Sequence, residues 1–470
     1  MCVSKENLLQ DLSNIVGSPY VKSDIYSRIS YADTAIPYDV EKEKLPDVIV
    51  YPADAEEISA VMQYANKQNI PVITYGSGTS LIHSTRPKHN GITMSTERLR
   101  SFEIDEENQF FECGAGVKTG QAIKELGKRG FFLPIQTQAG SSIGGAVGIN
   151  TLGHLTDNIF GRPLNNILGL EVVLPTGEII ETGSKSLRRS AGWDLTRVFV
   201  GAEGVLGVIT KVRMVLMPTP ATADAVGFFR TVEEIGRVIG LMYKNKLPLP
   251  MDGEFVAEKA CKVGCEAAGL DFPDGAMAIT RSMGRTHEDA LKNAQEIVEL
   301  FKQEGATQAF VLDDKEIAEK AWGVRENAMR WGQEKGLKGL LTIEVNPILT
   351  RLSEAMTELA HISETRGGLI SETESYLFGH VGADSLHLQF TFPYEWSIEK
   401  MKQVVDEIWD LERELQLKYN GVGGDWGWLP CRVPLYREKY GEVSYDIIKK
   451  MKLLFDPNNI LNRGNVEGEI

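Results

Sequence analysis

The sequence predicts an α+β protein built in two large parts, and three observations carry that prediction. A short β-branched strand, an amphipathic helix and a second strand follow one another within residues 48–75. Glycine then gathers in three clusters, each beside an apolar strand, between residues 76 and 210. From about residue 222 to 415, longer helices alternate with short strands, as in a second domain of mixed helix and sheet.

The composition limits the classes of function. The chain has 470 residues, of which 42% are hydrophobic and 24% charged, so it buries a full core and has room for two or three domains. Its 50 basic residues face 65 acidic ones, which leaves a net charge of −15 and no basic run. This balance argues against a nucleic-acid partner and against electrostatic docking on an anionic membrane.

The chain begins with a predicted short helix that ends at Gly17 and places Leu8, Leu12 and Ile15 on one face. It has neither the apolar core nor the cleavage site of a signal peptide, and no stretch approaches the ~18 apolar residues of a membrane-spanning helix. Because the cysteines are few, odd in number and scattered, we expect no disulfide framework and a reducing cytoplasm. They are Cys2, Cys113, Cys261, Cys265 and Cys431.

The first strand, residues 48–51, is closed by Pro52, and Asp54 is placed to cap the next helix. The apolar stripe of that helix consists of Ile58, Val61, Met62 and Ala65. The second strand, residues 71–75, runs directly into Gly76-Ser77-Gly78-Thr79-Ser80. A crossover of this kind places the glycine loop at a carboxyl strand end, where α/β sheets bind ligands.

This first glycine loop is not a standard nucleotide motif. It lacks the third glycine and downstream acid of a dinucleotide fingerprint, and the Gly-Lys-Ser/Thr ending of a P-loop. Its consecutive N–H groups and hydroxyls at Ser77, Thr79 and Ser80 suit an anion nest, whereas the alternative interpretation is a plain tight turn.

Two further glycine clusters favour the ligand interpretation. The backbone can approach a flat, large ligand closely along Ser141-Ser142-Ile143-Gly144-Gly145, which is followed by Asn150 and Gly153. A third cluster lies at residues 201–210, and Pro218 with Pro220 marks a boundary after it. We therefore expect one extended ligand wrapped by backbone.

These motifs together resemble the FAD-linked oxidases of the vanillyl-alcohol oxidase and p-cresol methylhydroxylase group, and most of all the glycolate oxidase and D-lactate dehydrogenase catalytic subunits. The resemblance runs from about residue 45 to the C-terminus. It implies a two-part FAD-binding domain of the p-cresol methylhydroxylase type, an α/β cap domain for the substrate and a C-terminal segment that returns to the flavin. The implied limits are 1–44 for the N-terminal helical segment, 45–221 for the FAD-binding domain, 222–415 for the cap and 416–470 for the C-terminal segment.

The resemblance also implies which residues bind FAD. The first loop holds the pyrophosphate, the second lines the flavin and ribityl chain, and the third contacts the isoalloxazine and adenine ends. The positions are Tyr75, Gly76, Ser77, Gly78, Thr79, Ser80, Gly140, Ser141, Ser142, Gly144, Gly145, Asn150, Gly153, Gly161, Glu203, Gly204, Gly207, Val208, Ile209 and Asn462. Some members of this group attach FAD to a histidine. Thr79 stands at that loop position. His83 and His154 are histidines that lie at other positions of the sequence, so we expect non-covalent FAD.

On the substrate side, His380 and His387 frame a segment at Gly382–Ser385 that can turn and bring the two imidazoles together. After it, Leu386, Leu388, Phe390 and Phe392 alternate with His387, Gln389 and Thr391. This alternation predicts a strand with His387 on its polar face.

In the resembling dehydrogenases both histidines bind a divalent metal with a glutamate near the C-terminus. Here Asp425 stands at that glutamate, and Trp426 replaces a histidine that can act as base. Because indole accepts no proton at neutral pH, this departure leaves the proton acceptor open. The resemblance therefore implies His380, His387 and Asp425 as ligands of Zn²⁺, Fe²⁺ or Mn²⁺. Without the resemblance, two histidines at this spacing are more often structural residues than metal ligands.

Arg325 matches the arginine that holds the substrate carboxylate in those dehydrogenases, and its planar fork suits that role. On sequence alone it reads equally well as a surface helix arginine, and Glu344 is a weaker candidate. Arg325, His387 and Trp426 are thus the expected catalytic positions.

The resulting hypothesis is an FAD-dependent dehydrogenase that oxidises a 2-hydroxy acid such as D-lactate or glycolate. A partner such as an electron-transfer flavoprotein is expected to take the electrons. Two alternatives stay open: oxidation of a bulkier aromatic alcohol or phenol, with Trp426 and Trp428 in the pocket, and a non-catalytic flavoprotein subunit of a redox complex.

Overall fold

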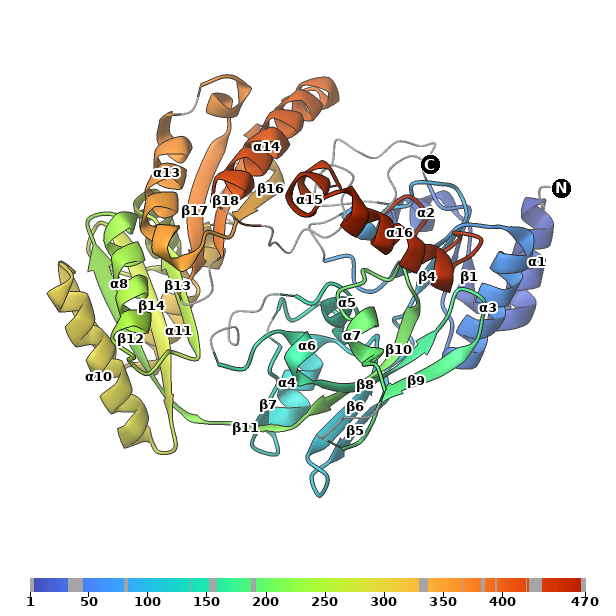
Figure 1. Cartoon of the computed structure of the whole chain (residues 1–470), viewed down its shortest axis with the longest axis horizontal. Helices are drawn as coiled ribbons and strands as arrows, with labels where there is room; N and C mark the ends of the chain where they lie inside the picture. The colour runs from blue at the N-terminus through green and yellow to red at the C-terminus, as the bar shows by residue number, and fades with distance from the viewer. Residues whose placement is uncertain are drawn as a thin grey trace.

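The computed structural model places two sheet-containing units beside one another, as Figure 1 shows. The described residues are 4–32, 45–79, 83–135, 137–151, 159–186, 192–328, 337–365 (backbone alone for 337–340), 367–381, 385–393, 395–419, 421 and 433–465. The first unit contains the N-terminal half and the C-terminal helices, and the second contains the sheet that begins at Ala221.

The first unit opens with helix α1, which is capped by the Ser4 side chain and ends before Gly17 as predicted. Leu8, Leu12 and Val16 are its buried residues, so Val16 takes the place expected for Ile15. The elements of this segment are α1 (Lys5–Val16), η1 (Ser18–Tyr20), β1 (Val21–Lys22) and α2 (Ile25–Ser30).

A four-stranded sheet in the order β1-β2-β4-β3 follows, and it confirms the predicted strand, helix and strand. Its elements are β2 (Val48–Val50), α3 (Ala55–Gln68), β3 (Val72–Tyr75), η4 (His83–Thr85) and β4 (Ile92–Ser95). Strands β2 and β3 are both parallel to β4, which lies between them. The Asp54 side chain accepts from the Glu57 amide at the start of α3, whose predicted apolar stripe is fully buried.

A five-stranded antiparallel sheet completes the first unit, in the order β5-β6-β10-β8-β9. Its strands are β5 (Phe102–Asp105), β6 (Phe110–Gly114), β8 (Ile167–Val173), β9 (Ile179–Gly183) and β10 (Val208–Val215). Its helices are α4 (Thr119–Gly127), α5 (Ile143–Gly148), α6 (Pro163–Asn166) and α7 (Thr196–Phe199). Both sheets share one apolar core.

The second unit is one seven-stranded sheet in the order β15-β12-β14-β13-β17-β18-β16. The strands are β12 (Ala221–Phe229), β13 (Asp252–Val256), β14 (Ala276–Gly284), β15 (Gln308–Leu312), β16 (Leu337–Val345), β17 (Glu374–His380) and β18 (Leu386–Pro393). Helices and strands alternate along the chain as expected, yet every strand pair is antiparallel. A short ribbon of β7 (Phe131–Phe132) and β11 (Met217–Pro218) precedes it.

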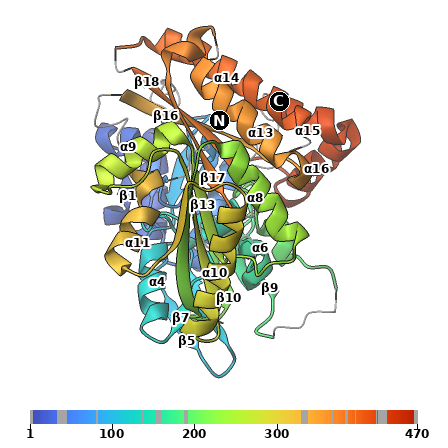
Figure 2. The same cartoon turned by 90° about the vertical axis from the view of Figure 1, so that its left-hand side faces the viewer.

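Different helices pack on the two faces of this sheet. The outer face, to the right of β13 and β17 in Figure 2, packs against helices that share a large apolar core with it. These helices are α8 (Val232–Lys244), α10 (His287–Gln303), α13 (Leu352–Thr365) and α14 (Ile398–Lys418), with η5 (Leu349–Arg351) and η6 (Leu369–Glu372) beside them. The opposite face packs against α9 (Glu258–Ala268) and α11 (Lys315–Trp322).

The C-terminus returns to the first unit, as expected. Helices α15 (Val433–Tyr440) and α16 (Glu442–Phe455) lead to Leu461, which forms a parallel bridge with Val72 of β3. The ammonium of Lys452 is buried and donates to the carbonyls of Val205 (3.0 Å) and Leu461 (2.7 Å) and to the Asp456 carboxylate. The last segment is thereby fixed against the third glycine cluster.

Among the described residues, no helix is long and apolar enough to cross a membrane. Cys113, Cys261 and Cys265 are free and buried, whereas Cys2 and Cys431 lie outside the described residues. The predicted domain limits stay predictions, although β12 begins close to residue 222.

Candidate functional site

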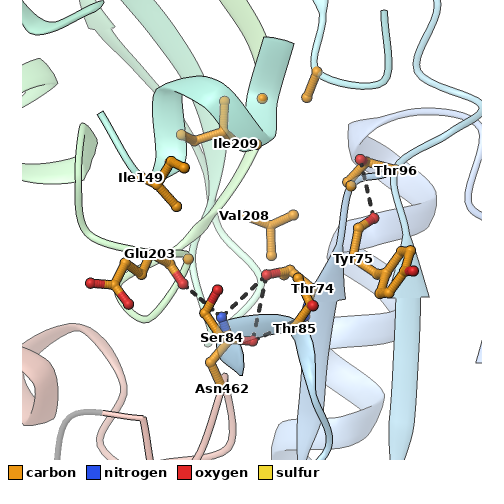
Figure 3. Close-up of a pocket in the computed structure, with 16 residues that line it drawn as sticks. Thr74, Tyr75, Ser84, Thr85, Thr96, Ile149, Glu203, Val208, Ile209 and Asn462 are labelled. Atoms are coloured by element: carbon orange, nitrogen blue, oxygen red, sulfur yellow. Dashed lines mark hydrogen bonds between the residues drawn. The ribbon is translucent and has the colours of Figure 1, made fainter. Parts of the chain in front are cut away.

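A pocket of about 570 Å³, partly open to solvent, lies in the first unit where the three glycine clusters meet. Figure 3 shows several of the residues that line it. The lining residues are Thr74, Tyr75, Gly76, Ser84, Thr85, Thr96, Ala115, Gly144, Gly145, Gly148, Ile149, Glu203, Gly204, Val208, Ile209 and Asn462. Nine of the predicted cofactor positions are therefore brought together on one cavity: Tyr75, Gly76, Gly144, Gly145, Glu203, Gly204, Val208, Ile209 and Asn462.

Asn462 joins segments of the pocket that lie far apart in sequence. Its side-chain oxygen accepts from the Thr74 amide at 3.0 Å, and its side-chain nitrogen donates to the Glu203 carbonyl at 2.9 Å (Figure 3). Asn462 is buried and holds a left-handed backbone with φ of 46°. An asparagine suits this place because it tolerates that conformation and can donate and accept at once.

Several glycines of the pocket are explained by close packing between loops. A Cβ at Gly144 would lie 2.5 Å from the Cβ of Ala115, and one at Gly204 would lie 2.6 Å from Thr74 Oγ1. Gly204 also has a φ of 70°, which favours glycine. Glycine is therefore required here to seat the loops on one another.

Gly148 differs from these glycines. It ends α5, lines the pocket and is buried, yet a Cβ built on it would meet no atom within 4 Å. Gly148 is buried, yet the space where its side chain would stand is open. We call this open space of the pocket the cradle, and a ligand can occupy it. Gly148 was not among the predicted positions, although it follows Gly144 and Gly145 at helical spacing.

Of the three hydroxyls predicted for the anion nest, those of Thr79 and Ser77 form hydrogen bonds with residues outside the first loop, and Ser80 lies outside the described residues. Thr79 Oγ1 and Ser141 Oγ lie 2.8 Å apart, and Ser142 Oγ accepts from the Gly145 amide at 3.3 Å. Lys118 Nζ donates to Ser77 Oγ at 2.7 Å, and sequence reasoning missed this lysine because it lies outside every glycine cluster.

Other predicted cofactor positions do not line the described pocket: Ser77, Gly78, Thr79, Gly140, Ser141, Ser142, Asn150, Gly161 and Gly207. Asn150 Oδ1 accepts from the Leu164 amide, and a Cβ at Gly161 would meet Asn165 Oδ1 at 2.5 Å, so both residues shape their own loop. Ser80, Gly153 and His154 lie outside the described residues, while His83 precedes the lining residues Ser84 and Thr85 in η4.

The predicted histidine pair meets on the second unit's sheet. His380 ends β17 and His387 lies near the start of β18, with ring centroids 5.3 Å apart and ring planes at 90°. Leu386, Leu388, Phe390 and Phe392 point into the apolar core on the outer face, as the alternation predicted. The polar face is buried as well, because α9 and α11 pack on that side of the sheet.

His387 belongs to a hydrogen-bond chain across two strands. Its Nε2 lies 3.1 Å from Ser385 Oγ, and Ser385 donates to Glu344 Oε1 at 2.7 Å. Asn346 Nδ2 donates to the same carboxylate oxygen at 2.9 Å. Since the serine hydroxyl donates to Glu344, it can accept a hydrogen bond only from a protonated Nε2 of His387. Glu344, the weaker candidate, is His387's register partner on β16.

Arg325 follows α11 and is not a surface arginine. Its side chain is 12% exposed, and its Nε lies 3.3 Å from Glu254 Oε1 on β13. Its guanidinium carbon stands 5.6 Å from the ring centroid of Phe378, and that ring lies 5.5 Å from the His387 ring. The carboxylate-binding candidate and the imidazole therefore border the same aromatic side chain.

Two buried polar groups beside this cluster lack hydrogen-bond partners among the described residues. Gln389, on β18 two residues after His387, is fully buried with both amide atoms unsatisfied. Asp252, on β13, has one unsatisfied carboxyl oxygen, and burial, helped by the nearby Glu254 carboxylate, raises its pKa well above the ordinary value. Unpartnered buried polar atoms are costly, and they mark places where a polar ligand can bind.

The predicted metal site is incomplete within the described chain. No group of three or more His, Cys, Asp or Glu side chains stands close enough there to hold an ion. His380 and His387 converge, but Asp425 and the predicted catalytic Trp426 lie outside the described residues, as does Trp428. The residues shown do not make a metal centre, so we derive no step through one.

The pocket in the first unit does fit the predicted flavin cofactor. A backbone-lined cradle with an open face at Gly148 admits a flat group or a phosphate chain, and the hydroxyl and amide groups beside it suit a diphosphate. Tyr75, Gly76 and Asn462 would hold the cofactor along one side, with Gly144 to Gly148 along the other.

Comparison with known proteins agrees with this geometry. Residues 46–183 match an FAD binding domain, and residues 220–466 match the C-terminal domain of FAD linked oxidases. The chain is 27% identical to the glycolate oxidase subunit GlcD of Bacillus subtilis, over 98% of this chain and 96% of that protein. It is 28% identical to a D-lactate dehydrogenase of Archaeoglobus fulgidus, over 89% of this chain and 91% of that protein.

Among solved structures, p-cresol methylhydroxylase with substrate bound aligns with a TM-score of 0.79 at 18% identity, covering 98% of this chain and 96% of that one. This likeness confirms the predicted fold, a p-cresol methylhydroxylase type of FAD-binding unit with a cap. Since the family's C-terminal domain alone matches more than half of the residues, the chain belongs to the FAD-linked oxidases, a family of flavoprotein oxidoreductases.

Proposed function

We propose that this protein is an FAD-dependent dehydrogenase that oxidises a small 2-hydroxy acid, of the D-lactate or glycolate type, to the 2-oxo acid. The observation that carries the proposal is that Arg325 and His387 both lie beside the Phe378 ring. A 2-hydroxy acid needs a cation for its carboxylate and a base for its hydroxyl, and this cluster offers both. The names of the two relatives, a glycolate oxidase subunit and a D-lactate dehydrogenase, support the same substrate class.

Substrate binding falls to Arg325 in this account. Its Nε lies 3.3 Å from the Glu254 carboxylate, and we assign the planar guanidinium to the carboxylate of the substrate. Glu254 is 2% exposed, so it holds the arginine from inside the protein. The unsatisfied amide of Gln389 is a further polar group for the substrate, and its full burial favours a small molecule.

Proton transfer falls to His387. The chain through Ser385 to Glu344 orients the His387 imidazole, which we assign as the base that takes the proton of the substrate hydroxyl. The Glu344 carboxylate then stabilises the imidazolium through Ser385, as the acid of a catalytic triad does. Bound FAD would supply the acceptor for the hydride of the α-carbon, so the two electrons and the proton of the alcohol would both be accounted for.

We further propose non-covalent FAD, because Thr79 stands at the attachment position and its hydroxyl bonds to Ser141. A redox partner such as an electron-transfer flavoprotein, and a cytoplasmic location, remain proposals from the sequence. A divalent metal on His380, His387 and Asp425 also stays a prediction. Metal quantification of the purified flavoprotein tests it, and a metal-free sample with full turnover would remove it.

A substrate panel tests the proposed activity. Turnover with an artificial electron acceptor should be highest for D-lactate or glycolate and low for vanillyl-type alcohols and p-cresol. Arg325→Lys keeps the charge but loses the fork, so it should raise KM for the acids with little effect on any neutral alcohol. Preference for the aromatic alcohols, or no turnover of any member, contradicts the proposal and favours one of the two alternatives.

A further inference from the structure

We propose that Lys118 supplies the positive charge that binds the diphosphate of FAD. Lys118 immediately precedes α4 and lies about 40 residues after the first glycine loop. Its ammonium donates to Ser77 Oγ at 2.7 Å, inside the Gly76–Thr79 loop. Gly76 of that loop lines the pocket, so the ammonium is bonded to the residue next to a lining position.

The backbone explains how a residue outside the glycine clusters reaches this place. Lys118 forms an isolated antiparallel bridge with Ser142, and the Thr119 amide donates to the Ser141 carbonyl at 2.9 Å. Lys118 is therefore fixed to the second glycine loop, while its side chain reaches across to the first. Lys118 thus links the loop that carries Thr79 to the loop that carries Ser141 and Ser142, through its side chain on one side and its backbone on the other.

The charge of Lys118 has no carboxylate partner among the described residues. Two other partly or fully buried lysines do have one: Lys211 lies 2.8 Å from Glu171 Oε2, and Lys452 pairs with Asp456. Burial lowers the pKa of Lys118, with Glu97 acting in the opposite direction from farther away. A half-buried cation beside an anion nest, without an acid to neutralise it, is complementary to phosphate oxygens.

A purely structural role makes a different prediction. If Lys118 only ties the two loops together through Ser77, its loss should weaken binding of every flavin equally and should not depend on salt. If it binds the diphosphate, its loss should weaken FAD and ADP but leave riboflavin unaffected, because riboflavin has no phosphate.

Apoprotein prepared from the holoenzyme separates the two roles. Lys118→Met should weaken FAD binding by about 10- to 100-fold, the worth of a charge-assisted hydrogen bond, and should flatten its dependence on NaCl. ADP should compete with FAD less well in this variant than in the wild type. Lys118→Arg should retain most of the affinity, and Lys124→Met, an exposed lysine of α4, serves as the matched control.

Three results would overturn the proposal: an FAD affinity within about twofold of wild type in Lys118→Met, an Arg variant as weak as the Met variant, or equal losses for riboflavin and FAD. A second measurement needs no variant. Amine acetylation of the wild-type apoprotein, read by mass spectrometry, should modify Lys118 and should be suppressed there by FAD and ADP but not by riboflavin. Equal modification of Lys118 with and without FAD contradicts the proposal, and Lys124 should react in every case.

Discussion

The cofactor pocket and the substrate-side cluster are built by opposite means. The pocket is made from backbone: glycines that seat loops on one another, one glycine that leaves a cradle open, and an asparagine that joins three segments. The cluster on the second sheet is made from side chains that strand register sets side by side, such as Glu344 opposite His387 and Glu254 opposite His380. The cofactor pocket, a site built from backbone, is therefore sensitive to any added side chain. The cluster on the second sheet, a site built by strand register, is sensitive to the loss of single polar atoms.

The largest expected effect tests the cofactor pocket, the site that is built from backbone. Gly148→Leu should reduce FAD affinity by at least about 100-fold, because the new side chain occupies the cradle and meets no protein atom near its Cβ. The apoprotein should remain folded, since leucine is a better helix former than glycine. Flavin titration and thermal melts check this, with Gly127→Leu on exposed α4 as control. Normal FAD binding in Gly148→Leu would show that the cradle lies elsewhere.

The next effect concerns the link between the C-terminus and the third glycine cluster. Lys452→Met should destabilise the holoprotein by about 3–5 kcal/mol, because it leaves Asp456 as an unpaired buried charge. Urea unfolding measures this, and Lys450→Met on the exposed side of α16 should cost almost nothing. A loss below about 1 kcal/mol in Lys452→Met would mean that the buried pair is not what fixes this segment.

A smaller effect tests the side-chain cluster that strand register builds on the second sheet. Ser385→Ala removes the link between Glu344 and His387, so kcat for the 2-hydroxy acid should fall about tenfold while KM and flavin content stay unchanged. Ser375→Ala, a buried serine on β17 that faces the other side of the sheet, is the matched control. Wild-type kcat in Ser385→Ala would exclude the proposed relay.

The smallest effect is a pH dependence of stability from Asp252. Its pKa in the folded protein lies above the ordinary value of 3.8, so the folded state keeps a proton that the unfolded chain has released. The stability gained from this proton is full below about pH 4 and is lost as the pH rises toward the folded pKa. Asp252→Asn should therefore gain stability relative to wild type as the pH increases.

The matched variant for this measurement is Asp446→Asn. The pKa of Asp446 is lowered by its hydrogen bond with Lys449, so its contribution has the opposite sign and appears above pH 4. Denaturant unfolding from acid to neutral pH follows both variants. A difference between Asp252→Asn and wild type that does not change with pH would show that Asp252 titrates normally.

The sequence points to the backbone site because its signals are local, and each of the three glycine clusters contributes lining residues. Nine of the twenty predicted cofactor positions line the pocket, because other residues of the same loops shape the loops themselves or lie outside the described residues. Lys118 and Gly148 were missed, since a long side chain reaching between loops and an empty cradle have no local pattern. On the second sheet, the sequence pointed to His380, His387 and, more weakly, Glu344. Ser385 and Gln389 had no signal of their own, because their roles depend on Glu344 and on burial, which follow from which strands pair.

Anaerobic reduction of the bound flavin tests the central claim, that the cap's arginine and histidine deliver a 2-hydroxy acid to the flavin. The account predicts that D-lactate or glycolate bleaches the wild-type flavin, and that Arg325→Met needs about 100-fold more substrate for the same rate while holding FAD equally well. A wild-type flavin that stays oxidised with saturating D- and L-2-hydroxy acids, or an Arg325→Met protein reduced as fast as wild type, would contradict it.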